Sequence, residues 1–266
     1  MPGFGNSKVE VEVEGPCGTL VLNQPAKLNP LGEEMLAAII EAAAWCNEQH
    51  GLKVVVVAGR GRAFSAGADV GAIAGGGAAV APPEPRDGPD LGRRMAEAVE
   101  GMRAVTIARI HGHCVGGGVV LASACDLRIA CPSASFRIPE VDLGIPLAWG
   151  GVQRLVREIG PARTKELVMS CRPFDALEAE RIGFLNRVVE EGRLAVEVEN
   201  LAATLAAKSA FALLSTKRQT DAVTASMVSL QTARLDADLF MAGLQDPEGR
   251  AKAAEYVERL AARRKR

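Results

Sequence analysis

Apolar and polar residues alternate near the start of the chain. Between residues 9 and 14 three valines alternate with three glutamates, and residues 19–22, beyond a glycine–proline pair, are again mostly apolar. Alternation with a period of two, interrupted by turn-forming residues, predicts two strands joined by a turn. A continuous apolar run over residues 54–58 predicts a further strand that is buried on both faces. Residues 105–110 and 126–130 are predicted as further short strands.

Longer segments carry apolar residues at every third or fourth position. Between residues 31 and 49 this spacing aligns Leu31, Met35 and Ile39, which predicts an amphipathic helix. Residues 194–266 are rich in alanine and follow a helical pattern almost throughout. Further helices are predicted over residues 91–103, 150–160 (with a glycine stop at Gly160), 161–171 and 175–182, and a short strand at residues 188–189.

A triple glycine, Gly116 to Gly118, follows the apolar run at residues 105–110 and leads directly into a helix-like apolar stretch. Without Cβ atoms, the backbone N–H groups of these residues can lie bare against a ligand. At a helix start such N–H groups have no partner and lie at the positive end of the helix dipole. The stretch can therefore bind an anion, stabilise negative charge that develops during a reaction, or form only a tight turn.

A second turn of small residues, at residues 63–70, follows the strand predicted at residues 54–58. Strand, small-residue turn and helix thus occur twice, about fifty residues apart, which predicts two similar layered units. Residues 71–89 are rich in glycine, alanine and proline, a composition typical of a mobile loop.

Composition and charge narrow the class of protein. The 266 residues are 48% hydrophobic and carry a net charge of -1, which fits a globular protein and argues against a nucleic-acid-binding surface. No apolar run approaches the roughly 18 residues that span a membrane. The first residues do not resemble a signal peptide, and the six cysteines show no paired spacing. We expect a cytoplasmic protein with reduced thiols.

Two groups of residues resemble reactive sites only superficially. His111 and His113 would share one face of a strand beside Cys114, but no fourth metal ligand accompanies them. We therefore expect structural histidines and no metal site. Ser65 lacks the Gly-x-Ser-x-Gly frame of a nucleophile, and we expect it to be present only because it is small.

Five segments in a fixed order resemble the crotonase, or enoyl-CoA hydratase/isomerase, superfamily, and the match runs nearly end to end along the chain. They are residues 23–31 (NQPAKLNPL), residues 64–69 (FSAGAD), the triple glycine with Cys125-Asp126, residues 139–145 (PEVDLGI), and residues 179–185 (AERIGFL).

The resemblance implies an α/β fold: a spiral of repeated β-β-α units followed by a helical C-terminal segment. We expect the spiral core to cover residues 1–193 and the helical oligomerisation segment residues 194–266. The family forms trimers, which often pair into hexamers. Its substrates are acyl-CoA thioesters, so no separate cofactor is expected, and neither nucleic acid nor a membrane is expected as a partner.

The resemblance also assigns the site residues. Two backbone N–H groups of the family stabilise an enolate, and by position these belong to Ala68 and Gly117. Losing one such donor typically costs about 10²–10³ in rate. The positions expected to contact substrate or CoA are Lys27, Leu28, Ala66, Gly116, Val120 and Trp149.

The acid–base residues bear on the reaction. Hydratases of the family usually carry two glutamates, at positions that correspond to Val120 and Glu140. Only Glu140 is a carboxylate here, and burial beside Pro139, Val141 and Leu143 is expected to raise its pKa. One base can move a proton from C2 to C4 of a 3-enoyl-CoA, as in enoyl-CoA isomerases of the mitochondrial type, which resemble this pattern.

Two alternatives stay open. Glu140 alone, or with a water held by other groups, could hydrate a 2-enoyl-CoA, or the chain could bind acyl-CoA without catalysis. Asp142 could replace the missing carboxylate if its segment were extended, or it could cap the turn before Gly144. Leu147 and Ala148 stand where dienoyl isomerases and dehalogenases of the family carry an aspartate close by, which argues against those reactions.

Overall fold

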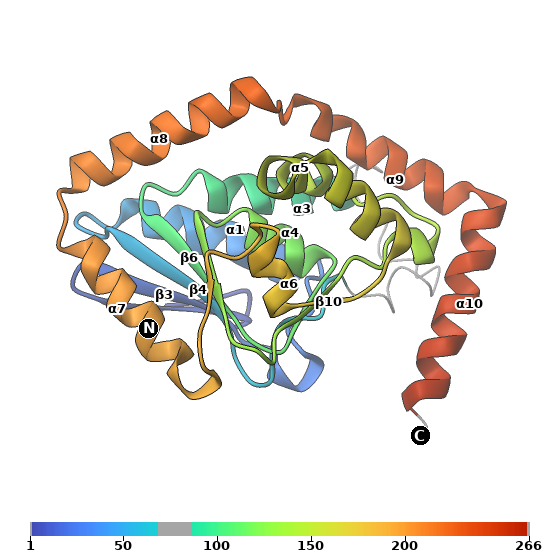
Figure 1. The fold of residues 1–266 in the computed structure, drawn as a ribbon, viewed down its shortest axis with the longest axis horizontal. Helices are drawn as coiled ribbons and strands as arrows, with labels where there is room; N and C mark the ends of the chain where they lie inside the picture. The colour runs from blue at the N-terminus through green and yellow to red at the C-terminus, as the bar shows by residue number, and fades with distance from the viewer. Residues whose placement is uncertain (1, 69–86, 265–266) are drawn as a thin grey trace.

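The computed structural model describes residues 2–68 and 87–264 of the chain (Figure 1). The strands are β1 (Gly3–Phe4), β2 (Val9–Glu14), β3 (Cys17–Leu22), β4 (Val54–Gly59), β5 (Ala63–Ser65), β6 (Val105–Ile110), β7 (His113–Val115), β8 (Leu127–Ala130), β9 (Ser135–Arg137), β10 (Phe174–Asp175) and β11 (Arg187–Val188). The α-helices are α1 (Glu33–Glu48), α3 (Asp87–Glu100), α4 (Gly117–Ser123), α5 (Gly151–Ser170), α6 (Ala176–Arg181), α7 (Leu194–Ala206), α8 (Ala210–Met227), α9 (Asp236–Gln245) and α10 (Pro247–Arg264). Short 3-10 helices are η1 (Pro25–Lys27), η2 (Val141–Leu143), η3 (Glu191–Arg193) and η4 (Gln231–Leu235).

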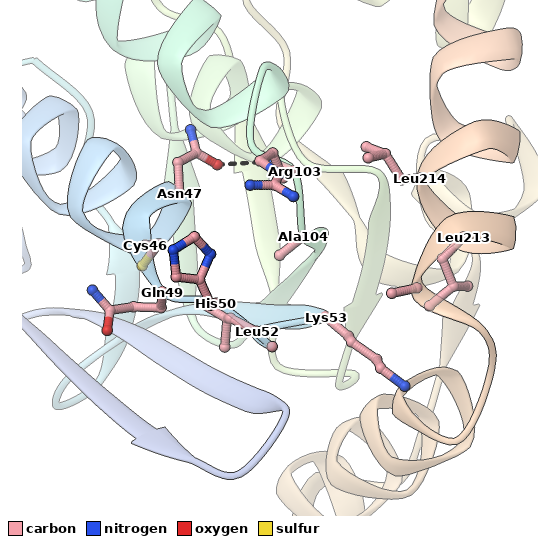
Figure 2. Close-up of a pocket in the computed structure, with 12 residues that line it drawn as sticks. Cys46, Asn47, Gln49, His50, Leu52, Lys53, Arg103, Ala104, Leu213 and Leu214 are labelled. Atoms are coloured by element: carbon pink, nitrogen blue, oxygen red, sulfur yellow. Dashed lines mark hydrogen bonds between the residues drawn. The ribbon is translucent and has the colours of Figure 1, made fainter.

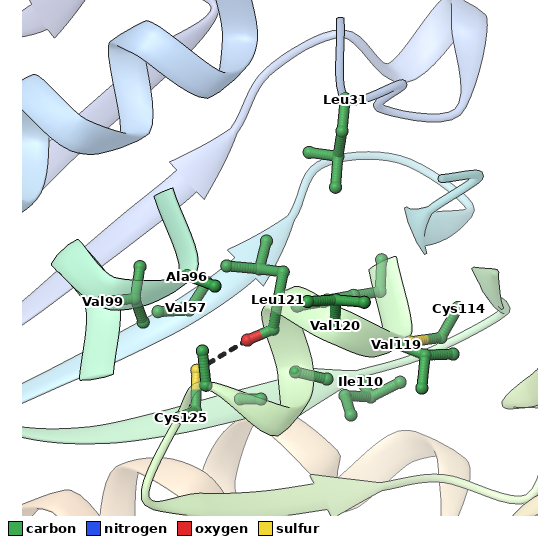
Figure 3. Packing of buried hydrophobic residues seen from close by; sticks show 14 of the residues in the cluster. Leu31, Val57, Ala96, Val99, Ile110, Cys114, Val119, Val120, Leu121 and Cys125 are labelled. Atoms are coloured by element: carbon green, nitrogen blue, oxygen red, sulfur yellow. Dashed lines mark hydrogen bonds between the residues drawn. The ribbon is translucent and has the colours of Figure 1, made fainter. Parts of the chain in front are cut away.

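The strand β4 is buried on both faces, as its continuous apolar run predicts. Because alternate residues of a strand point to opposite faces, Val55 and Val57 join the apolar layer with α1, α3 and α4. Val54 and Val56 join the opposite layer, which α7 covers. Figure 3 shows α4 enclosed within the first layer, with Val57 of β4 and Val99 of α3 beside it.

The chain winds as a spiral in which successive strands enter two different sheets. In the described residues the larger sheet has the order β1-β2-β3-β4-β6-β8-β11 and the smaller one the order β10-β9-β7-β5. The strands β4, β6 and β8 are parallel neighbours in the first sheet, and β5, β7 and β9 are parallel neighbours in the second. The predicted α/β spiral of repeated β-β-α units is therefore confirmed.

The C-terminal helices α8, α9 and α10 run along the outside of this core (Figure 1). A partly buried ion pair attaches α8 to the core, with Lys217 Nζ 2.8 Å from Asp126 Oδ2. Tyr256 of α10 packs with Leu143 and Ile145, so that α10 lies against η2. The division of the chain at residues 193 and 194 stays a prediction.

The structure bears differently on three local predictions, which concern the histidines, the loop at residues 71–89 and the glycine at residue 160. His111 and His113 do not share a strand, because Gly112, with φ 56°, separates β6 from β7. The predicted loop at residues 71–89 lies outside the described residues up to residue 86, and α3 already begins at Asp87. The stop at Gly160 is confirmed, since its φ of 78° and ψ of 165° interrupt α5.

Within residues 2–68 and 87–264, none of the helices has the length and apolar character required to cross a membrane.

Candidate active site

Two backbone turns meet at the start of α4. One follows β5 and contains Gly67, and the other follows β7 and contains Gly117. A Cβ atom on Gly67, whose φ is +84°, would lie 2.4 Å from Val115 O and 3.4 Å from Gly117 N. Only glycine allows the backbones to approach this closely. Ala68 and Gly117, the predicted enolate-stabilising residues, therefore lie on turns that contact each other.

The N–H groups of these two residues are available to a ligand. Gly116 precedes α4 with φ 50° and ψ -115°, and its own N–H donates to Arg137 O at 2.8 Å. In the described part of the chain, the N–H groups of Gly117 and Ala68 have no hydrogen-bond acceptor. Bare N–H groups fixed in this way can stabilise an oxyanion that forms during a reaction.

Glu140 approaches the same place from the segment that follows β9. It follows β9 and precedes η2, where its backbone carbonyl accepts hydrogen bonds from Leu143 N and Ile145 N, each at 3.0 Å. Its side chain reaches Gly116, because a Cβ atom on Gly116 would lie 2.5 Å from Glu140 Oε1. The carboxyl oxygen Oε2 is buried and has no hydrogen-bond partner among the described residues, although the residue as a whole stays partly exposed.

The environment of Glu140 suits a proton carrier. Burial disfavours the charged carboxylate and raises the pKa of Glu140 from 4.5 to about 7. The expectation that burial would raise this pKa agrees with that shift. Transfer of a proton in both directions is most effective when the pKa of the carrier lies near the working pH.

A hydrogen-bonded cluster around Asn29 holds the first turn in place. The buried Asn29 amide donates to Ala63 O at 3.0 Å and accepts from Gln24 N at 2.8 Å. The Ser65 hydroxyl donates to Asn29 O at 2.8 Å and accepts from Gly67 N at 3.1 Å. From the sequence, Ser65 is expected to be present only because it is small. In the structure its hydroxyl also fixes the turn that carries Ala68. Asn29 lies inside segment 23–31 of the family resemblance, but nothing in the sequence indicated this structural role.

The three residues predicted for the CoA groove lie along this turn. Ala66 N donates to Leu28 O at 2.8 Å, so Ala66 and Leu28 are neighbours. Leu28 has φ 64° at the end of η1. Lys27, the last residue of η1, is exposed. Lys27 directly precedes Leu28, and its exposed side chain is accessible to a phosphate group in solvent.

Val120 is a residue of α4, and Trp149 lies against the first residue of that helix. Val120 is 1% exposed and belongs to the core, where a Cβ atom on Gly151 would be 2.8 Å from Val120 Cγ2. The Trp149 indole lies against Gly117, where a Cβ atom would be 2.3 Å from Trp149 Cζ3. The structure thus brings Ala68, Gly116, Gly117, Glu140 and Trp149 together and places Val120 in the core.

Asp142 does not supply a second carboxylate to this place. The segment after Glu140 is the 3-10 helix η2 and is not extended, so alternate residues do not share a face. The Asp142 carboxylate pairs with Arg137 Nη2 at 2.7 Å, and it forms no side-chain cap of the turn before Gly144. Both expectations for Asp142 were wrong because Arg137, at the end of β9, holds the side chain.

A cavity of about 130 Å³ lies elsewhere in the molecule (Figure 2). The lining of this cavity includes His50, Lys53, Arg103 and Leu213, and none of the predicted site residues takes part. Among the described residues, no group of three or more histidine, cysteine or acidic side chains could hold a metal ion. The side chains of His111 and His113 instead contact Gly61 O at 2.8 Å and Ser135 Oγ at 3.1 Å.

Known proteins resemble this chain over most of its length. Residues 14–265 match the family described as "Enoyl-CoA hydratase/isomerase". The chain is 35% identical over 204 residues to "Crotonyl-CoA hydratase" of Syntrophomonas wolfei subsp. wolfei, which covers 76% of this chain and 77% of that protein. It is 31% identical over 212 residues to the peroxisomal "Delta(3,5)-Delta(2,4)-dienoyl-CoA isomerase" of Arabidopsis thaliana, which covers 74% of each chain. The crystal structure of an enoyl-CoA hydratase from Bacillus anthracis superposes with a TM-score of 0.76 at 31% identity, covering 89% of this chain and 90% of that one.

Proposed function

This chain belongs to the enoyl-CoA hydratase/isomerase family, and on that premise we propose that it converts 3-enoyl-CoA into 2-enoyl-CoA. The chain is an enzyme of the hydratase or isomerase type, which argues against a non-catalytic acyl-CoA binder. The proposed substrate is an acyl-CoA thioester whose carbonyl oxygen accepts hydrogen bonds from the N–H groups of Ala68 and Gly117.

In the proposed reaction the Glu140 carboxylate removes a proton from C2 of the substrate. The electron pair moves onto the thioester oxygen, and the two backbone donors stabilise the resulting dienolate. Glu140 then returns the proton at C4, so that the double bond moves from C3–C4 to C2–C3 and nothing is gained or lost. The expected CoA contacts of Lys27, Leu28 and Ala66 would hold the thioester while the proton moves.

One observation carries this proposal. Among the residues that the structure describes, one carboxylate, Glu140, lies against Gly116 at the start of α4 and has a pKa raised to about 7, where relatives that hydrate usually present two. Val120 occupies the second position, and its methyl groups, packed against Gly151, cannot carry a proton or hold water. A proton shuttle needs one base, whereas hydration requires both the activation of a water and the delivery of a proton.

Hydration of 2-enoyl-CoA is the second candidate function. It is favoured by the printed name of the Syntrophomonas relative, a crotonyl-CoA hydratase. In this case Glu140 would act alone on a water molecule near the same two donors.

Purified enzyme assayed separately on 3-enoyl-CoA and 2-enoyl-CoA distinguishes the two functions. Isomerisation forms the conjugated 2-enoyl thioester and raises its ultraviolet absorbance, whereas hydration removes that absorbance. We expect turnover of the 3-enoyl substrate to exceed hydration of the 2-enoyl substrate. Hydration as fast as isomerisation would support the second function, and binding of both thioesters without turnover would contradict the proposal.

The proposal includes no cofactor, because the base and the donors belong to the chain and CoA is part of the substrate. A cytoplasmic location is also proposed. It is supported by six free cysteines, which persist in a reducing compartment.

The proposal further includes a homotrimer, or a hexamer of two trimers, formed through the C-terminal helices. Large apolar side chains are exposed on α8, where Phe211 is 81%, Val223 60% and Met227 77% exposed. Several such side chains on one helix support a surface that contacts another protein, whereas single exposed apolar residues are common on any surface.

In light scattering, we expect the enzyme to show three or six times the mass of one chain. Phe211→Asp should shift this mass towards that of one chain, because it places a charge in the proposed contact. Leu177→Asp is a matched control, since Leu177 is 65% exposed on α6, outside the C-terminal segment. A single-chain mass for the unaltered enzyme would contradict the proposed trimer.

A further inference from the structure

Trp149 adopts a backbone conformation that side-chain-bearing residues rarely take. Its φ is 63°, and the next residue, Gly150, has a φ of 73°. A residue other than glycine persists in this left-handed region only when its surroundings fix it, and such residues often occur at functional sites. The residues that contact Trp149 must therefore hold it in this conformation.

Two charged side chains hold the turn of Trp149. Arg154 of α5, whose side chain is 2% exposed, donates to Trp149 O at 3.1 Å and pairs with Glu100 of α3 at 2.5 Å. Asp236 of α9 accepts a hydrogen bond from Gly150 N at 2.8 Å. The helices α3, α5 and α9 thus jointly fix the direction in which the indole points.

The indole fills the space between α3 and the start of α4. A Cβ atom on Gly117 would lie 2.3 Å from Trp149 Cζ3, and one on Gly92 of α3 would lie 2.0 Å from Trp149 Cε2. Glycine at both positions lets the ring pack directly against the two backbones. Any larger side chain at either residue would displace the ring.

The position of the indole limits the length of acyl chain that can extend beyond the thioester carbonyl. That carbonyl is proposed to lie at Gly117 N, and the indole packs against the α-carbon of the same residue. An acyl tail directed between α3 and α4 would meet the ring within a few carbon atoms. We infer that Trp149 forms the end wall of the acyl site and makes the enzyme selective for short-chain acyl-CoA thioesters. The inference rests on the proposed function for the position of the thioester.

Binding of saturated acyl-CoA thioesters tests this inference without turnover. Calorimetry gives Kd for butanoyl-CoA and decanoyl-CoA with the unaltered enzyme and with Trp149→Ala and Trp149→Phe. Removing the indole opens a cavity of the order of the ~150 Å³ that accepts benzene in an engineered core. One methylene in an apolar pocket changes discrimination by about 10–200-fold. We therefore expect Trp149→Ala to lower the ratio of the decanoyl to the butanoyl Kd at least tenfold, and Trp149→Phe to lower it less.

Trp45→Ala is the matched control, because Trp45 is the other tryptophan and packs against Phe4, away from the site. It should leave the Kd ratio unchanged. The inference would be overturned if the ratio of the decanoyl to the butanoyl Kd were the same in the unaltered enzyme and in both Trp149 variants. If Trp149→Ala does not fold, the comparison with Trp149→Phe decides alone. A changed ratio without turnover of 3-enoyl-CoA would overturn only the proposed reaction. Failure to bind any acyl-CoA would overturn both.

Discussion

Glu140→Gln is expected to lower kcat for 3-enoyl-CoA isomerisation by about 10²–10⁴-fold, the usual contribution of general acid–base catalysis. Glutamine keeps the size of the side chain but cannot accept the C2 proton. Because glutamine has nearly the same size and shape as glutamate, the substrate site keeps its form and KM should change little. Steady-state rates with 3-enoyl-CoA measure both parameters.

The pH profile adds a second readout. Burial raises the pKa of Glu140 to about 7, and only the deprotonated carboxylate can act as the base. The value of kcat/KM should therefore rise with pH through about 7 and level off above it. This rise should disappear from the residual activity of Glu140→Gln. Glu166→Gln, an identical change at an exposed carboxylate paired with Arg172, should leave rate and profile unchanged. A Glu140→Gln enzyme with most of its activity would exclude Glu140 as the base.

Gly67→Ala is expected to lower kcat/KM by about 10²–10³-fold, the effect of losing one oxyanion donor. The added Cβ atom would meet Val115 O at 2.4 Å and would have to push the two turns apart. The N–H groups of Ala68 and Gly117 could then no longer converge on one oxygen. Kinetics on 3-enoyl-CoA measure the loss.

Gly15→Ala provides the control for backbone strain. Gly15 also has a positive φ, +55°, but a Cβ atom there would meet nothing within 4 Å. It should therefore keep full activity, although it too places alanine in the left-handed region. Full activity of Gly67→Ala, verified as folded by circular dichroism, would show that the turns need not touch for catalysis.

Local patterns predicted much of the fold. The alternation at residues 9–14 and the apolar run at residues 54–58 became β2 and β4, because strand periodicity and burial are encoded over a few residues. The glycines of the two small-residue turns likewise indicated where the backbones approach each other. The backbones of Gly67 and Gly117 approach each other although fifty residues separate them, because the preceding strands β5 and β7 are parallel neighbours in one sheet.

Long-range partners could not be predicted in this way. The Ser65 hydroxyl bonds the backbone of Asn29, from which it is separated by 36 positions, although nothing near either residue in the sequence indicates this contact. Trp149 was expected to contact substrate, but the glycine of α3 that receives its indole lies far away in the chain. Such pairings depend on tertiary packing, which overrides local preference.

The fate of a deuterium label most directly tests the claim that one carboxylate moves one proton. The substrate is 3-enoyl-CoA with deuterium in place of both hydrogens at C2, the reaction is run in ordinary water, and NMR locates the label in the product. Because Glu140 Oε2 is buried and has no partner among the described residues, we expect part of the deuterium removed from C2 to appear at C4 of 2-enoyl-CoA. Hydrogen at C4 derived wholly from water, together with accumulation of 3-hydroxyacyl-CoA, would contradict the single-base isomerase.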